Sequence, residues 1–487
     1  MAKAEHGIRQ AAIRLAMAGG VEMGLQVLMP VILVRYLDVA GFGHYRLLWL
    51  MALTTFAIAP CFMPQSMFYL LPRAAEPRAR AILLGNTLVY LVTAGLLGAL
   101  LTSGWNPWMP AAARELFTLS AGKSALFIGL WTIGSLFDVL PTADGHARWQ
   151  ARATVLIAVF RTAALGLAAF LTGDVDWVIG AMLAVIGAKL LALLYYIGSR
   201  AGPLRRPLGF DGQRLRAQLH YALPFALGNA LFLLRAQADQ WVVASLLSTA
   251  SYAMFSIGAV LQPVGTLIRA PVLNAVMARL NAACAAGDKA EAASLLARSN
   301  GSAAFFLLPV AGGLMLVAPE LVEIIYTRKY LPTVPVMQVY LGGMMLSSFA
   351  LSHALPALNQ GRFVTLNNGV SLVLSVATSL AGVHYCGMLG AALGSVLTLG
   401  FSELWSARLI ALELGTPLTR LLALRTLGPT LLAVAAGLAA GALAGAALSL
   451  PAPLLLLCKG GAYALVAGAV LLALGGRRTL MAMLGRA

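Results

Sequence analysis

The sequence predicts an all-α integral membrane protein with about fourteen transmembrane helices. Of its 487 residues, 60% are hydrophobic and 10% are charged, and the mean hydropathy is +0.85. A soluble protein of this length could not bury so much apolar surface, so lipid is the expected solvent. Only helices and closed barrels satisfy the backbone in hydrocarbon. The apolar runs are long and continuous rather than alternating, which favours helices over a barrel.

Each expected span is an apolar run close to the ~20 residues that a helix needs to cross a bilayer. Short polar connections separate these runs. The spans are expected near 12–36, 45–71, 82–104, 119–141, 153–172, 177–199, 218–247, 251–278, 300–319, 333–356, 363–382, 387–411, 423–449 and 453–475. Several contain proline, which often marks a bend beside a cavity in membrane helices: Pro30, Pro60, Pro64, Pro224, Pro263 and Pro271.

Basic residues are distributed unevenly between the two sets of connections. The two tails and alternate connections hold 23 of the 34 Lys and Arg residues, and the opposite connections and span ends hold seven. This bias predicts an even number of spans in an inner membrane with both termini cytoplasmic. The net charge of +17 would suggest nucleic acid in a soluble protein, but this loop pattern indicates anionic headgroups instead, and no nucleic-acid partner is expected.

The two ends of the first span carry further signals. The N-terminus, "MAKAEHGIRQAAIRLA", runs into the span with no convincing cleavage site, so we expect an uncleaved first helix. "RYLDVAGFGHYR", residues 35–46, is expected to be a tight outer-face turn whose flanking arginines, Arg35 and Arg46, reach the headgroups.

Weak similarities recur at a near-constant spacing and indicate an internal duplication. "GFGHYR" is similar to "STASYAM", with Tyr45 matching Tyr252 at an offset of 207, and "LPTADGHARW" is similar to "LPALNQGRFV", with Pro141 matching Pro356 at 215. The predicted organisation is a six-helix lobe at 1–199, a basic cytoplasmic linker at 200–217, a second six-helix lobe at 218–412, and an additional helix pair with a basic tail at 413–487. Two such halves suggest alternating access to a cavity between them.

Placing an ionisable side chain inside a membrane span costs free energy, so we expect each one to have a partner or a function. In "LFLLRAQADQWVV", Arg235 and Asp239 are four apart on one helix face. They are either a cavity-lining site with an ion-coupling carboxylate or a self-neutralising pair. Glu22, four residues before Gln26, is either an ion-coupling group or half of a buried ion pair.

Three further cations lie inside spans. Arg161, Lys189 and Arg269 could line a cavity that attracts a diphosphate or an acidic sugar through charge-assisted hydrogen bonds. The alternative is snorkelling or pairing with Asp138, Glu22 or Asp239. For Arg161 and Lys189 we expect this alternative, snorkelling or pairing, and for Arg269 a cavity position.

In-span amides are the remaining candidates. Asn229 and Gln65, with Gln262 and Asn274, could hydrogen-bond sugar hydroxyls, or they could join helices. Walker, HExxH and GxSxG motifs are absent, and the four cysteines and six histidines have no metal spacing. The sequence therefore predicts no enzyme, cofactor or metal site, and any drive would come from a proton, sodium or substrate gradient.

Three stretches resemble polysaccharide-type flippases of the multidrug/oligosaccharidyl-lipid/polysaccharide (MOP) exporter superfamily. They are "LVRYLDVAGFGHYRLLWLMA" with "QSMFYLLPR", "HYALPFALGNALFLLRAQADQWVVASLLSTASYAMFSIGAV", and "LPALNQGRF". The resemblance, which covers about 10–412, implies two six-helix lobes in an inverted V around a central cavity. It also implies movement of a lipid-linked glycan, usually on undecaprenyl diphosphate, from the inner to the outer leaflet. Arg35, Asp239 and the in-span arginines are the positions it suggests for function.

The leading hypothesis is therefore a flippase for a lipid-linked oligosaccharide or polysaccharide precursor. Membrane lipids, a polysaccharide polymerase and chain-length proteins would be its partners. One alternative is a cation-coupled multidrug exporter, which would favour carboxylates and aromatic residues in its cavity; four in-span cations argue against it. The other is a non-transporting membrane scaffold for glycan assembly.

Overall fold

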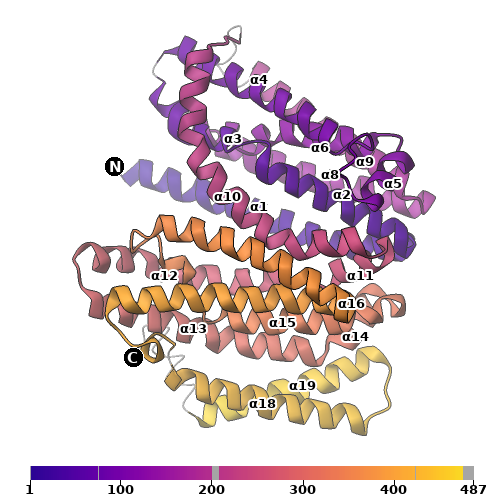
Figure 1. Cartoon of the computed structure of the whole chain (residues 1–487), viewed down its shortest axis with the longest axis vertical. Helices are drawn as coiled ribbons and strands as arrows, with labels where there is room; N and C mark the ends of the chain where they lie inside the picture. Colours follow the sequence, from indigo (N-terminus) through magenta and orange to yellow (C-terminus); the bar gives the residue numbers. More distant parts are fainter. Residues whose placement is uncertain (1, 75, 200–207, 423, 475–487) are drawn as a thin grey trace. The chain divides into compact units, whose positions relative to one another are not determined.

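The computed structural model describes residues 2–74, 76–199, 208–422 and 424–474. Within these ranges every regular element is a helix, as Figure 1 shows. Ten helices are long and apolar enough to cross a membrane, and eleven if a bent pair counts as one span. The predicted all-α membrane fold is therefore confirmed.

The first repeat of the chain consists of helices α1 to α9. Two short 3₁₀ helices, η1 and η2, follow α3 and α6. The elements are α1 (Ala2–Tyr36), α2 (Val39–Ile58), α3 (Met63–Leu70), η1 (Leu71–Arg73), α4 (Pro77–Leu101), α5 (Ala111–Leu119), α6 (Lys123–Gly134), η2 (Ser135–Asp138), α7 (Leu140–Ala143), α8 (Ala147–Thr172) and α9 (Val175–Ser199).

The second repeat consists of α10 to α16, and three more helices follow it. The elements are α10 (Gly212–Leu246), α11 (Thr249–Gly258), α12 (Gln262–Ala285), α13 (Lys289–Leu316), α14 (Ala318–Tyr326), η4 (Arg328–Thr333), α15 (Val334–Ser347), η5 (Ser352–Ala354), α16 (Gly361–Leu414), α17 (Leu418–Leu421), α18 (Leu424–Ala447) and α19 (Ala452–Ala473).

The order and lengths of these helices reproduce the duplication expected from the sequence. Helices α1 and α10 both have 35 residues and begin 210 residues apart, and α2 and α11 also begin 210 apart. Helices α5 and α14 both have nine residues and begin 207 apart, and α8 and α16 begin 214 apart. In both repeats a broken helix follows the first long helix.

The fourteen expected spans each fall on one helix or on a broken helix. Three of them are absent from the ten helices selected by length and hydropathy, and two others count there as one helix. Residues 45–71 form the broken pair α2–α3, which is bent by 44°, and residues 251–278 form the broken pair α11–α12. Helix α15 has only 14 residues, and the two spans 363–382 and 387–411 are joined in α16.

Helix α16 is a hairpin of two antiparallel helices rather than one rod of 54 residues. Gly387 has φ 57° and ψ −139°, a conformation that favours glycine. Residues on either side of it then pair in antiparallel order: the Thr378 hydroxyl donates to the Gly394 carbonyl at 3.0 Å, and Asn367 Nδ2 donates to Ser402 Oγ at 3.0 Å. Small residues let the two helices approach closely, as is common between membrane helices.

The turn at residues 35–46 is shorter than the sequence suggested. Helix α1 ends at Tyr36, and Asp38 caps α2 by accepting a hydrogen bond from the Gly41 amide at 2.9 Å. Both glycines of the Gly-x-Gly motif therefore lie inside α2 and not in the turn, which corrects the expected start of this span at residue 45. A Cβ on Gly43 would overlap the Thr249 carbonyl, so the motif serves close packing against α11.

The break between α2 and α3 comes from two residues with positive φ. Cys61 has φ 47° and Phe62 has φ 58°, and Pro60 precedes them. The Ala59 carbonyl, which the break leaves outside the helical ladder, accepts a hydrogen bond from the Tyr90 hydroxyl at 3.1 Å. Side chains thus satisfy the backbone where a membrane helix is interrupted.

By packing, the chain divides into two units. One unit comprises residues 1–237 and 248–253, and the other comprises 238–247 and 254–487. The first half of α10 packs within the first unit, where Gln218 Nε2 donates to Ser66 Oγ at 2.9 Å and to Thr87 Oγ1 at 3.0 Å. The predicted lobe limits stay a prediction; residues 200–207 of the expected linker and 475–487 of the basic tail lie outside the described residues.

The additional helix pair, α18 and α19, packs against the second repeat. Lys459 Nζ lies 2.8 Å from Glu320 Oε1, and both side chains are largely buried. The Tyr463 hydroxyl donates to the Pro309 carbonyl at 2.7 Å, and its ring packs on Gly312 and Gly313. The pair is therefore anchored to α13 and α14 by polar contacts.

The α16 hairpin gives a test of its own packing. A Cβ on Gly390 would overlap the backbone of Gly382, whereas nothing lies within 4 Å of a Cβ on Gly369 in the same helix. We expect Gly390→Ala to destabilise the protein by about 1–3 kcal/mol through overpacking. Gly369→Ala, the matched control, is expected to stabilise it by up to ~1 kcal/mol through helix propensity. Thermal unfolding in detergent measures both, and equal melting temperatures would contradict the hairpin contact.

Candidate functional site

The first candidate feature is a pair of arginines in the first unit, Arg46 on α2 and Arg161 on α8, which we call the arginine cluster. Arg161 Nη1 lies 3.9 Å from Glu22 Oε1 on α1, so the structure contains one of the pairs that the sequence offered. The Arg161 side chain is 11% exposed and the Glu22 side chain 43%. Glu22 therefore has a cationic neighbour, at a distance where pairing is weak.

Two guanidinium nitrogens in this cluster lack a hydrogen-bond acceptor within the described residues. They are Nη2 of Arg161 and Nε of Arg46, and both are buried. Both arginines lie within electrostatic reach of Tyr45, which adjoins Arg46 in α2. Buried donors without acceptors are rare and are candidate ligands for an anion. From the sequence, Arg46 was expected in the connection between the first two spans and was not proposed as a site residue. The signal that could have identified it is its position directly after Tyr45, which matches Tyr252 in the second repeat.

Lys189 forms the second ion pair of the first unit. Its Nζ lies 2.8 Å from Asp138 Oδ2, and its side chain is 9% exposed while that of Asp138 is 52% exposed. The ammonium group also lies 4.8 Å from the ring centroid of Trp131 and 5.4 Å from that of Phe137, within cation–π range. The expected pairing of Lys189 with Asp138 is thus present, and aromatic rings cover the lysine.

Asp239 lies in a polar cluster of the second unit. It is 2% exposed, and its Oδ2 accepts a hydrogen bond from the Tyr340 hydroxyl at 2.6 Å. Ser395, on the second half of α16, provides another hydrogen bond. Three helices, α10, α15 and α16, therefore meet at this carboxyl, and hydroxyl groups rather than cations hold it there.

Arg269 on α12 contacts the end of α15. Its two terminal nitrogens donate to the carbonyl of Ser347, the last residue of α15, and to that of Ala350 in the turn that follows. Glu403, which accepts from Ser352 Oγ at 2.8 Å, acts on the guanidinium electrostatically. This position fits helix capping; the expected cavity role of Arg269 stays a prediction.

The other predicted residues lie apart from these clusters. Arg35 is exposed at the end of α1, and Asn229 is exposed on α10. Gln65 on α3 is half-buried and its Oε1 has no donor within the described residues. Arg235 is half-buried, with its guanidinium carbon 5.8 Å from the ring centroid of Phe232.

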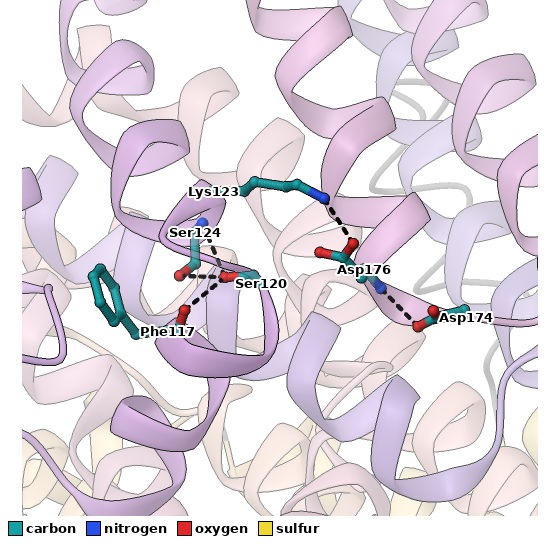
Figure 2. Close-up of polar contacts among 6 residues, drawn as sticks. All are labelled: Phe117, Ser120, Lys123, Ser124, Asp174 and Asp176. Carbon is teal, nitrogen blue, oxygen red and sulfur yellow. Dashed lines mark hydrogen bonds and ion pairs between the residues drawn. The ribbon is translucent and has the colours of Figure 1, made fainter.

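A further ion pair joins the beginnings of α6 and α9. Lys123 Nζ lies 2.6 Å from Asp176 Oδ2, and the Asp176 amide donates to Asp174 Oδ1 at 3.0 Å (Figure 2). Ser120 and Ser124 hydrogen-bond each other at 2.9 Å beside it (Figure 2). This network fixes two helix starts at the face expected to be outside. Among the described residues, no group of three His, Cys, Asp or Glu side chains could hold a metal ion.

Comparison with known proteins assigns the fold. The solved structure of the lipid II flippase MurJ in an inward closed conformation covers 95% of this chain and 99% of its own, with 14% identity and a TM-score of 0.69. A multidrug resistance MATE transporter of the MOP superfamily, inward-facing, covers 83% and 98%, with 15% identity and a TM-score of 0.65. The chain has the MOP fold. A MOP transporter from Pyrococcus furiosus is also similar, with 15% identity, coverage of 83% and 96%, and a TM-score of 0.53.

A family model described as polysaccharide biosynthesis protein matches residues 148–335. This segment begins in α8 of the first repeat and ends in α15 of the second. A comparison with curated proteins finds no match. The resemblance inferred from the sequence is confirmed: this MOP-fold chain is similar to the polysaccharide branch as well as to drug transporters. Its apolar helices make it a multi-pass membrane protein, and its fold is one that transporters and flippases share.

The Lys189–Asp138 pair gives a prediction for stability. Asp138→Asn leaves a buried ammonium without its counter-ion, which should destabilise the protein by up to ~3–5 kcal/mol, while Lys189→Met leaves only a half-exposed carboxylate and should cost less. The double variant should recover part of the loss of Asp138→Asn. Unfolding in detergent checks the cycle, and strictly additive effects would show that the pair is not coupled.

Proposed function

We propose that this chain is a flippase that moves a lipid-linked oligosaccharide or polysaccharide precursor, carried on undecaprenyl diphosphate, from the inner to the outer leaflet of the inner membrane by alternating access. The observation that carries this proposal is the match to the polysaccharide biosynthesis family model on a MOP fold. The fold alone would serve drug export equally well.

The arginine cluster supports an anionic substrate. Arg46 and Arg161 each have a buried N–H group without an acceptor among the described residues, and Glu22 lies 3.9 Å from Arg161, where it neutralises that arginine only in part. Arginine is suited to diphosphate because its planar donors bind phosphate oxygens in pairs. A diphosphate could therefore replace Glu22 as the partner of Arg161. The roles expected for Arg35, Lys189, Arg235 and Arg269 are part of the same proposal.

The additional helix pair favours a flippase over a drug exporter. The MurJ structure covers 95% of this chain, and the MATE structure covers 83%. The difference, 12% of 487 residues, is about 58 residues, close to the 50 residues from Leu424 to Ala473 that form α18 and α19. The length of the chain is thus that of the lipid II flippase fold.

Asp239 is the proposed coupling residue. It is buried in the second unit and held by the hydroxyl groups of Tyr340 and Ser395. A proton or a sodium ion could bind such a carboxyl, whereas Glu22 is engaged by Arg161. The gradient of that ion would then drive the cycle. The excess of basic residues on alternate connections supports cytoplasmic termini, and a polymerase and chain-length proteins are the expected partners.

Reconstitution tests the proposal. Purified protein in liposomes should accelerate the transfer of a fluorescent undecaprenyl-diphosphate oligosaccharide between leaflets. Arg161→Gln should slow it by about tenfold, since one charge-assisted contact to phosphate is lost. Arg114→Gln, an exposed arginine on α5, is the matched control. Transport of cationic dyes but not of the lipid would indicate the drug exporter, and transport of neither, with binding of glycan-assembly proteins, the scaffold.

The coupling residue gives a separate prediction. Asp239→Asn should abolish the dependence of flipping on an imposed proton or sodium gradient, because the titratable group is gone. Tyr340→Phe removes one hydrogen bond of about 0.5–1.5 kcal/mol and should shift the ion dependence without abolishing it. Flipping rates at matched gradients measure both effects. A gradient response retained in Asp239→Asn would exclude this carboxyl as the coupling site.

A further inference from the structure

A ladder of aromatic rings runs along α3 and α10 in the first unit. The rings of Phe62 and Phe225 stack with centroids 5.5 Å apart, and those of Tyr69 and Tyr221 stack at 4.8 Å with an interplanar angle of 12°. Tyr221 and Phe225 link the two stacks at 5.6 Å. The guanidinium of Arg73 lies 3.5 Å from the centroid of Tyr69 and ends the ladder.

The spacing of these residues places them on one face of each helix. Phe62, Tyr69 and Arg73 are separated by seven and four residues, and Tyr221, Phe225 and Asn229 by four each, so each set occupies one helix face. From Phe62 to Arg73 the ladder rises about 16 Å. It therefore extends from the break between α2 and α3 to the basic connection after α3.

Side-chain amides are interleaved with the rings. Gln65 lies between Phe62 and Tyr69 on α3, and its buried Oε1 has no donor within the described residues. Asn229 is exposed one turn beyond Phe225. Hydrogen bonds also hold α10 to α3 and α4, because Gln218 on α10 donates to Ser66 on α3 and to Thr87 on α4. The ladder is thus held in place by hydrogen bonds and carries one exposed amide, Asn229, and one buried amide oxygen without a donor among the described residues, that of Gln65.

The composition of this surface differs from that of a face in contact with acyl chains. Tyr69 is 41% exposed and Phe225 51%. Between residues 153 and 171 of α8, by contrast, the exposed large side chains are all apolar, namely Leu156, Val159, Phe160, Leu167, Phe170 and Leu171. Rings combined with amides and a guanidinium suit carbohydrate, because a pyranose presents a C–H face to a ring and hydroxyl groups at its edge.

We propose that the ladder binds the saccharide part of the lipid-linked precursor along its exposed side, with Phe225 and the exposed edge of Tyr69 as the main contacts. The amides of Gln65 and Asn229 hydrogen-bond the sugar hydroxyls, and Arg73 receives an acidic or hydroxyl-rich end. The inference rests on the proposed function and adds a glycan site separate from the arginine cluster. It predicts that the ladder matters more for a long glycan than for a single sugar.

The test compares two substrates. Tyr69→Leu and Phe225→Leu should each slow the flipping of an undecaprenyl-diphosphate oligosaccharide by about tenfold, which corresponds to ~1.4 kcal/mol, while leaving the carrier with one sugar within about twofold. Tyr69→Phe keeps the ring and should retain most of the rate. Phe306→Leu on α13, where Phe306 is 41% exposed, is the matched control. Equal slowing with both substrates, or none with either, would overturn the glycan site.

A binding measurement separates this inference from the proposed function. Saturation-transfer NMR of the free oligosaccharide with the purified full chain should show transfer to the sugar protons that Tyr69→Leu and Phe225→Leu weaken. If the wild-type protein flips neither lipid, the proposed function fails. The saturation-transfer measurement still shows whether the ladder binds the oligosaccharide. Transfer that is unchanged in both variants, or absent in the wild type, would overturn it.

Discussion

The cost of placing a charge in hydrocarbon constrains every site in this protein. Arg161 lies beside Glu22, Lys189 beside Asp138, and Lys459 beside Glu320. Arg269 instead binds the carbonyls at the end of a helix. In each case the partner comes from another helix, so the same contact that makes the charge tolerable also fixes the packing of two spans. Arg161 also keeps a buried Nη2 without an acceptor among the described residues, and this is the group that the proposed substrate site would use.

Periodicity and composition were sufficient to predict the fold. Long apolar runs required helices, and the offset of about 207–215 residues between similar segments predicted the two repeats that α1–α9 and α10–α16 form. The pairing of Lys189 with Asp138 was also accessible, because a buried cation needs a carboxylate and few are available in the spans. These predictions depend on physical requirements that hold along the whole chain.

Local backbone geometry could not be predicted from the sequence in the same way. The Gly-x-Gly motif looked like a turn, but Asp38 caps α2 earlier and Gly43 lies under the Thr249 carbonyl. Helix α10 looked like the start of the second lobe, yet Gln218 bonds to helices of the first unit. The role of Arg269 as a cap, and the aromatic ladder, depend on which residues from distant segments meet, and spacing along one helix cannot supply that information.

The hairpin of α16 has a mechanical consequence. Its two arms are joined through the single residue Gly387 and interlock through Gly382, Gly390 and Gly394, so neither arm can slide along the other. In the first repeat, α8 and α9 are connected almost as tightly, through Gly173 and Asp174. The last two helices of each repeat are thus a helix pair joined by a very short connection. We therefore expect any bending within a repeat to occur at interrupted helices such as α2–α3 and α11–α12.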